Sequence, residues 1–333
     1  MSNLLHLTVE TSRIDLNGYE WEQIITDYFP NLKVFQWKTC IELNNDTDKE
    51  QQVNKRIDSF RSSFWIDKHQ WFVRCHSGFT FQSNVIWIYT LPYAFHDFST
   101  TVINIQFRST CPQEHDFHSY DRVNRFVYES SIIRECASFH VKFPNIHHLL
   151  LEHGPDYHFW SMIPTLDQLV SLEIFLCDDI DDTIQAQLHD LLDLAPRLYS
   201  LKLRSWPYLP FFLTEIKSHS IRRLDFQGSD RSYREMWFSD DECDRLCRST
   251  LGVQCEVLFI RVKHRQSILD LINRMSNLRA LNVQCQDNRL DESDSLSWSR
   301  DDELVTWFEH QLPLTWKIAK DPRWHRCIQM WVG

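Results

Sequence analysis

Residues 169–175 read Leu-Val-Ser-Leu-Glu-Ile-Phe, and residues 198–204 read Leu-Tyr-Ser-Leu-Lys-Leu-Arg. Both stretches contain the same motif, apolar-x-x-apolar-x-apolar. Its last two apolar positions are separated by one other residue, as on one face of a β-strand. The motif recurs along the chain in copies that begin at Val123, Ile146, Leu169, Leu198, Ile221, Cys255 and Leu278. The steps between copies are 23, 23, 29, 23, 34 and 23 residues, so the sequence contains an internal repeat.

A repeat of roughly 20 to 29 residues with this motif is typical of leucine-rich-repeat proteins. Parallel strands pack about 4.8 Å apart, whereas neighbouring helices need roughly 8 to 10 Å, so the helical side of such a stack forms the longer, outer arc. The sequence therefore predicts an α/β fold, a leucine-rich-repeat solenoid. We expect an open horseshoe with parallel strands on its concave face and helices and loops on its convex face.

Apolar residues at helical spacing fill several gaps between the copies. Residues 183–194 and 264–275 each place them on one face and are predicted to be helices. A third helix is expected to begin at Ser239, because Ser239 and Glu242 form the pattern of a capping box. An earlier helix is expected over residues 21–28, between two further copies of the motif near the start of the chain.

The repeat divides the chain into segments of different regularity. Because each unit of a solenoid contacts only its neighbours, residues 1–333 are predicted to form a single solenoid. Within it we expect N-terminal repeats over 1–40, an irregular insert or degenerate repeats over 41–122, and regular repeats over 123–290. Residues 291–333 are expected to be a tryptophan-rich C-terminal cap. Strands are predicted in the insert at 71–76, 85–90 and 102–107, and a helix in the cap at 301–311.

Composition narrows the partners and the compartment. The chain has 35 basic and 46 acidic residues and a formal charge of -11, which disfavours nucleic acid because its affinity for proteins comes mainly from Lys and Arg. The first residues lack a secretory leader, and no long apolar run is present, so no membrane partner is expected. Ten cysteines without a clustered framework favour reduced thiols. We predict a cytoplasmic or nuclear protein.

Motifs for enzyme chemistry are missing from the sequence. It has no Gly-x-Ser-x-Gly elbow, phosphate-binding loop, dinucleotide fingerprint or His-Glu-x-x-His motif, and it contains only 6 glycines. The acidic run at 178–182 is interpreted as the start of a helix rather than a calcium site. Cys243 and Cys247 are interpreted as a buried helix face rather than a metal site. We therefore predict no catalytic residues, no cofactor, no metal and no enzyme.

The repeat also predicts which side chains face a partner. Within each copy the second and third apolar residues should point into the core, so the residues between and after them should form rows on the concave face. Glu173, Lys202 and Asp225 are expected side by side with alternating charge. One interpretation is that these charges neutralise one another; the other is that they belong to a protein-binding surface with exposed aromatic and Arg groups. The candidate surface is Glu173, Phe175, Lys202, Arg204, Asp225, Phe259 and Arg261.

Two repeats place a cysteine three residues past the last apolar strand position, at Cys40 and Cys177. This is similar to the cysteine-containing leucine-rich repeats of F-box proteins. Together with the stretches 60–65, 71–76, 89–95, 143–146 and 328–332, these repeats resemble an invertebrate family of F-box, leucine-rich-repeat proteins. In that family an F-box ahead of the repeats binds the Skp1-type adaptor of a cullin-RING ubiquitin ligase.

The resemblance implies a substrate-receptor role. The chain itself contains no F-box pattern, so a Skp1-type adaptor is expected as a partner only if an F-box precedes Met1. Our hypothesis is a non-enzymatic protein-protein recognition module, the substrate-binding part of an F-box-type ubiquitin-ligase receptor. The alternatives are a leucine-rich-repeat scaffold or assembly protein unconnected with ubiquitin, and a hydrolase whose site is assembled from grouped histidines.

Overall fold

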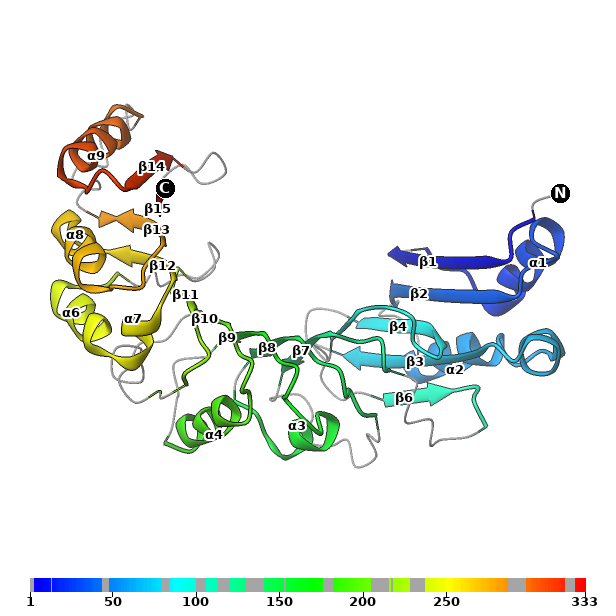
Figure 1. Cartoon of the computed structure of the whole chain (residues 1–333). Coiled ribbons are helices and arrows are strands. Elements are labelled where there is room, and N and C mark those ends of the chain that lie inside the picture. The colour runs from blue at the N-terminus through cyan, green and yellow to red at the C-terminus, as the bar shows by residue number, and fades with distance from the viewer. Residues whose placement is uncertain are drawn as a thin grey trace. The chain divides into compact units, whose positions relative to one another are not determined.

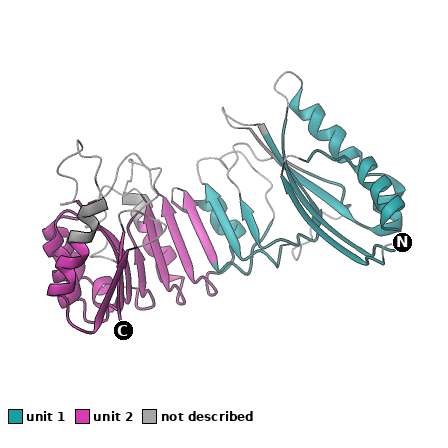
Figure 2. Ribbon diagram, turned by 90° about the horizontal axis from the view of Figure 1, so that it is seen from above, with its two compact units in different colours: residues 1–147, 155–165 teal, residues 148–154, 166–333 magenta. Residues whose placement is uncertain are grey.

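The structure is a computed structural model of the chain. It describes residues 3–12, 14–43, 48–79, 84–99, 106–112, 120–129, 141–152, 154–175, 182–204, 216, 218–227, 237–286, 298–320 and 327–333. The chain divides into two compact units, shown in different colours in Figure 2. Unit 1 comprises residues 1–147 and 155–165, and unit 2 comprises residues 148–154 and 166–333.

Unit 1 contains a five-stranded mixed sheet in the order β1-β2-β4-β3-β6. β1 (His6–Ser12) runs parallel to β2 (Val34–Glu42). The next three pairings are antiparallel and join β2 to β4 (Asn84–Leu91), β4 to β3 (Phe72–Phe79) and β3 to β6 (Gln106–Ser109). The β3 and β4 predictions at 71–76 and 85–90 are confirmed, and β6 coincides with the end of the third predicted strand. Residues 102–105 lie outside the described part of the chain.

Helices lie on one side of this sheet, as Figure 2 shows. They are α1 (Gly18–Tyr28), α2 (Lys49–Asp58) and the short π-helix η1 (Phe64–His69). α1 begins at a capping box in which the Asn17 side chain accepts hydrogen bonds from backbone N–H groups and Glu20 bonds back to Asn17. Aromatic side chains fill the space between helices and sheet, and the buried ones include Trp21, Phe35, Trp37, Phe60, Trp65 and Trp71.

Unit 1 also contains a pair of parallel strands and a short helix. β5 (Asp97–Ser99) pairs in parallel with β7 (Arg125–Glu129). Helix α3 (Tyr157–Met162) begins at Asp156, whose carboxylate accepts a hydrogen bond from the Phe159 N–H. Along β7 the side chains of Phe126 and Tyr128 are buried, as the repeat motif predicts for its last two apolar positions.

Unit 2 is built on parallel strands that follow one another in chain order. They are β8 (His148–Glu152), β9 (Ser171–Phe175), β10 (Ser200–Arg204), β11 (Arg223–Asp225), β12 (Val257–Val262) and β13 (Ala280–Cys285). Each strand pairs in parallel with the next. An antiparallel hairpin continues the sheet, because β15 (Ile328–Val332) pairs with β13 and β14 (Trp316–Lys320) pairs with β15.

The connections in unit 2 contain helices α4 (Asp182–Asp193), α6 (Asp240–Arg248), α7 (Thr250–Gln254), α8 (Arg265–Arg274) and α9 (Trp298–Gln311). Figure 1 shows α6, α7 and α8 beside the strands β11 to β13. The helices predicted over 183–194 and 264–275 are confirmed as α4 and α8. The predicted start at Ser239 is also confirmed, because Ser239 and Glu242 form a capping box on α6.

The described residues therefore form a mixed α/β fold with parallel-strand sheets. The part of the chain predicted as an insert, 41–122, contains β3, β4, β5 and β6 together with α2 and η1. The part predicted as a C-terminal cap, 291–333, contains α9, β14 and β15. Among the helices that the structure describes, none combines the length and apolar character needed to cross a membrane.

Candidate functional site

The parallel strands of unit 2 place the predicted side chains in a row. Lys202 on β10 stands opposite Glu173 on β9 and opposite Asp225 on β11. Asp225 in turn stands opposite Phe259 on β12, which stands opposite Asn282 on β13. These pairings confirm, within this unit, the register predicted from the repeat. A one-residue slip between any two of the strands would move the side chains of one strand to the other face and break the row.

Burial along the strands separates this row from the core. On β9 and β10 the apolar residues Leu172, Ile174, Leu201 and Leu203 are buried, whereas the residues between them are partly exposed. Successive side chains of a strand point to opposite faces, so these intermediate residues stand on the face away from the core. We call this surface of Glu173, Phe175, Lys202, Arg204, Asp225 and Phe259 the charged face.

Ion pairs link the charged side chains of this face. The Lys202 Nζ lies 3.5 Å from the Glu173 Oε1 and 3.7 Å from the Asp225 Oδ2, and the Arg204 Nε also contacts the Glu173 carboxylate. The exposed fractions of the Glu173 and Asp225 side chains are 19% and 14%. Burial raises the pKa of Asp225, and the neighbouring Lys202 ammonium lowers it. The charges neutralise one another, as one of the two interpretations predicted.

Aromatic rings stand beside this ion network. The Arg223 guanidinium lies 4.6 Å from the centre of the Phe259 ring, which is the geometry of a cation–π contact. Phe175 stands opposite Arg204 on the neighbouring strand. Phe175, Arg204 and Phe259 are all partly exposed. The face therefore combines aromatic, Arg and paired charged groups on adjacent strands.

Arg261 corrects one predicted member of the surface. The expectation that its side chain is exposed is wrong, because Arg261 is 4% exposed and its Nε donates a hydrogen bond of 2.8 Å to the Gln284 Oε1. The side chain is drawn along the sheet toward Gln284, which stands opposite Arg261 on β13. A second segment also lies beside the backbone at the end of β12. Phe238 bridges to Val262, and its backbone N–H donates to the Arg261 carbonyl. Phe238 lies in the longest step within the regular repeats, from Ile221 to Cys255, and no copy of the motif there would have predicted this bridge.

Amide side chains close the neighbouring part of the sheet. Gln227 donates through Nε2 to the side-chain oxygen of Asn282 at 2.8 Å and to its backbone carbonyl at 3.1 Å. Asn282 is 8% exposed. The accessible groups of the charged face are therefore those on β9 to β12 before Arg261, where the sequence had placed Glu173, Phe175, Lys202, Arg204, Asp225 and Phe259.

A group of Asp240, His264 and Ser267 joins helices α6 and α8. The His264 Nδ1 lies 3.1 Å from the Asp240 Oδ2, and the Ser267 hydroxyl donates a hydrogen bond to the same carboxylate. The Ser267 hydrogen bond lowers the pKa of Asp240. Because Ser267 bonds to the carboxylate and not to the imidazole, this group lacks the nucleophile–base contact that serine hydrolases use. Its effect is to tie two helix N-termini together.

The cysteines predicted as a helix face are buried on α6. Cys243 is 2% exposed and Cys247 is 6% exposed. Burial raises the pKa of the Cys243 thiol to about 12 and raises that of Cys247 as well. Within the described ranges, no three His, Cys, Asp or Glu side chains lie close enough together to hold a metal ion. The acidic residues 178–181 and His153 lie outside those ranges.

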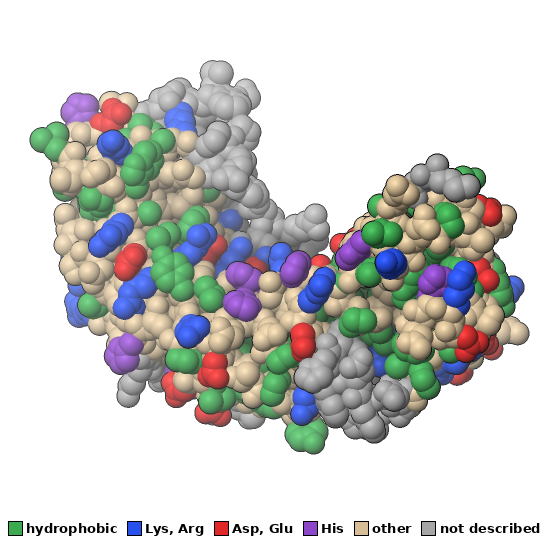
Figure 3. All heavy atoms as spheres, turned by 45° about the vertical axis from the view of Figure 1, so that its right-hand side comes forward, with side chains coloured by type: hydrophobic (Ala, Val, Ile, Leu, Met, Phe, Trp, Pro, Cys, Tyr) green, Lys and Arg blue, Asp and Glu red, His purple; other side chains and the backbone are tan. Residues whose placement is uncertain are grey.

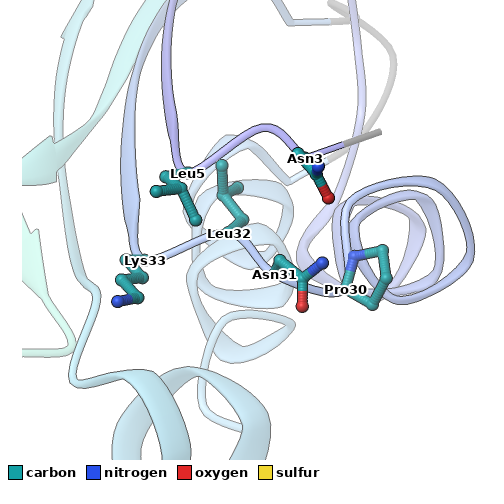
Figure 4. Close-up of a pocket in the computed structure, with 6 residues that line it drawn as sticks. All are labelled: Asn3, Leu5, Pro30, Asn31, Leu32 and Lys33. Atoms are coloured by element: carbon teal, nitrogen blue, oxygen red, sulfur yellow. The ribbon is translucent and has the colours of Figure 1, made fainter. Parts of the chain in front are cut away.

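A surface hollow lies at the beginning of β1 and β2 in unit 1. It has a volume of about 570 Å³ and is lined by Asn3, Leu5, Pro30, Asn31, Leu32 and Lys33 (Figure 4). Its lining has one charged group and no nucleophile or carboxylate, which gives it no arrangement for catalysis. On the face that Figure 3 shows, basic and acidic side chains both occur among the described residues.

The fold and the charged face together define a mixed α/β protein with a parallel, repeat-built sheet and one row of outward polar and aromatic side chains. In comparisons with known proteins, no family model and no curated protein matches the chain.

Proposed function

We propose that the chain is a non-enzymatic protein-recognition module, built as a leucine-rich-repeat-like solenoid, and that it is the substrate-binding part of an F-box-type ubiquitin-ligase receptor. The observation that carries the proposal is the row of Glu173, Lys202, Asp225 and Phe259 across neighbouring parallel strands. Repeats stacked in this way produce extended binding surfaces. The receptor role is supported by the resemblance of the sequence to F-box, leucine-rich-repeat proteins.

The chemistry of the charged face fits a protein partner. Aromatic and Arg side chains are the types that contribute most to binding at protein interfaces, and Phe175, Arg204 and Phe259 supply them here. The contacts of Arg204 and Lys202 with Glu173 hold these long side chains before a partner arrives. A surface whose side chains are already ordered loses less conformational entropy on binding.

The experiment is an affinity purification from cells with the full chain and with a Phe175→Ala/Arg204→Ala variant. We expect the variant to recover the specific partner at least about tenfold less efficiently, because it loses two side chains of the hot-spot type. The matched control is Leu194→Ala/Arg197→Ala, which removes an exposed apolar residue and an Arg after α4, away from the row. Equal recovery by all three proteins contradicts the proposed surface.

The receptor role needs a separate measurement. The longest transcript that contains this chain is expressed, and its co-purification with a Skp1-type adaptor is measured. Co-purification is expected for a substrate receptor. If the partner of the charged face is recovered and the adaptor is not, the recognition surface stands and the ubiquitin-ligase role is wrong, which leaves a scaffold.

A further inference from the structure

Strand β1 has an open hydrogen-bonding edge. It pairs with β2 over seven consecutive residues, from His6 with Val34 to Ser12 with Cys40, without a bulge. On its other side, no strand that the structure describes lies next to it (Figure 1). The Leu5 carbonyl accepts hydrogen bonds from the backbone at the start of β2. The backbone N–H and C=O groups of successive strand residues point to opposite sides of the strand. Those of Leu7 and Val9 therefore also point to β2, and those of His6, Thr8 and Glu10 point to the open edge.

The apolar core is incompletely covered at this edge. Leu4, Leu7 and Val9 pack against the core of unit 1 and are only partly buried, whereas Phe35 and Trp37 on β2 are 3% and 1% exposed. Leu5, which directly precedes β1, is 51% exposed. An added strand would therefore bury apolar surface as well as satisfy backbone groups.

Other edge strands in the described sheets carry features that prevent pairing. β14 has only five residues, two of which are Lys317 and Lys320. β6 has four residues and carries Arg108. Short length and charged side chains are the usual protection of a sheet edge. β1 has seven residues with no Lys, Arg or Pro, and its one acidic residue, Glu10, is paired with Lys38, so β1 has less of this protection.

The sequence of β1 is complementary to itself in one antiparallel register. When a two-fold axis passes through Thr8, Thr8 faces Thr8, Leu7 faces Val9, and His6 faces Glu10 of the other strand. Threonine pairs and donor–acceptor pairs across an antiparallel ladder are stabilising. In this register His6, Thr8 and Glu10 make the hydrogen-bonded pairs, which agrees with the direction of their backbone groups. A two-fold axis through Glu10 would place two carboxylates opposite each other, which is unfavourable.

We propose that β1 pairs antiparallel with β1 of a second copy of this chain, with the two-fold axis at Thr8. A two-fold axis perpendicular to the sheet keeps the apolar sides of both sheets on the same face, so Leu7 and Val9 of the two copies extend one core. The register brings Ser12 of the other copy opposite Leu4, at the end of β1 where the hollow lined by Asn3 and Leu5 lies (Figure 4). Closed two-fold symmetry is the commonest form of self-association.

The test measures the dissociation constant of the full chain by sedimentation over the micromolar concentration range. We expect a dimer that His6→Glu weakens at least about tenfold, because it places a second carboxylate opposite Glu10 at two symmetric positions. The exchange His6→Glu/Glu10→His restores an imidazole opposite a carboxylate and should return the dissociation constant to within about threefold. Lys38, which pairs with Glu10, keeps its contact with Asp97 in this variant. Lys317→Glu on β14 is the control and should leave the dimer unchanged.

Circular dichroism verifies that each variant is folded. Thr8→Lys, at an exposed position whose backbone faces the open edge, is a second disrupting variant in case His6→Glu does not fold. A monomer at every concentration overturns the proposal. A dimer that both disrupting variants leave intact, or one that the exchange variant does not restore, also overturns it, because association then uses another surface or register.

Discussion

Lys38 on β2 shows how a single charged residue is accommodated among the aromatic side chains of unit 1. It is 4% exposed, and its Nζ lies 3.1 Å from Glu10 and 2.7 Å from Asp97. The same ammonium lies 5.3 Å from the centre of the Phe95 ring. Both carboxylates are more than half exposed and remain hydrated. The cation is therefore stabilised by ion pairs and by a ring, while most of the desolvation falls on Lys38 itself.

Lys38→Glu should destabilise the protein far more than Lys38→Met. The glutamate would place a third carboxylate in a nearly buried position beside Glu10 and Asp97, at a cost of more than about 3 kcal/mol. Methionine fills a similar volume and leaves two hydrated carboxylates, so we expect a loss of about 1 to 2 kcal/mol, mainly from the cation–π contact. Urea unfolding of the three proteins measures both differences. Equal losses would contradict this account of the site.

The buried thiols predict a pH dependence of stability. Burial raises the pKa of Cys75, Cys243 and Cys255 to about 12. The folded state therefore keeps thiol protons that the unfolded chain releases above its ordinary pKa of 9.0. The free energy of unfolding should fall as the pH rises from 9.0 toward 12, by up to about 1.4 kcal/mol per pH unit for each thiol.

Cys243→Ala isolates one of these contributions. Compared with the unchanged protein, its free energy of unfolding should decline less steeply above pH 9, because one thiol is missing from the unfolded chain. Urea unfolding at a series of pH values measures the slopes. Identical slopes for the two proteins would show that Cys243 is not desolvated in the folded state.

Among the helices and strands, the repeat motif predicted the parallel strands of unit 2 and their register, because both depend on the alternation of apolar residues. The row from Glu173 to Phe259 follows from counting along each copy, and the helices α4 and α8 follow from apolar spacing. The antiparallel part of unit 1 could not be predicted in the same way. Its strands β3 and β4 have strand character in the sequence, but their pairing with β2 depends on contacts between residues distant in the chain.

The sequence also could not predict that Arg261 is buried. Its side chain bonds to that of Gln284, and such a single side-chain contact leaves no periodic signal. The ion pairs among Glu173, Lys202 and Asp225 were predictable, since opposite charges fall on adjacent strands at the same level. Periodic features were thus accessible from sequence, and isolated tertiary contacts were not.

Gly18 tests the contact between α1 and α2. Alanine normally favours a helix over glycine by about 1 kcal/mol, but a Cβ at Gly18 would lie 2.2 Å from the Ser59 carbonyl oxygen. The Gly18 N–H also donates to the Ser59 hydroxyl at 2.7 Å. We expect Gly18→Ala to destabilise the protein by about 1 to 3 kcal/mol because backbone must move. Thermal unfolding measures the sign, and a stabilised variant would contradict the close approach.

In the whole molecule, the charged face of unit 2 is the surface that we propose binds a protein. The charges of this face are paired among themselves, so its specificity would depend on the shape and the aromatic groups around the ion pairs. Association of two copies through β1 would involve the other unit and a different set of residues, and each claim can fail without the other.

The most direct measurement is site-specific photo-crosslinking in cells. A photoreactive phenylalanine analogue replaces Phe175 on the charged face or, as a control, Val253, which is 49% exposed on α7. The account predicts a discrete crosslinked protein from position 175 and none from position 253. Crosslinks of the same pattern from both positions, or from position 253 alone, would contradict it.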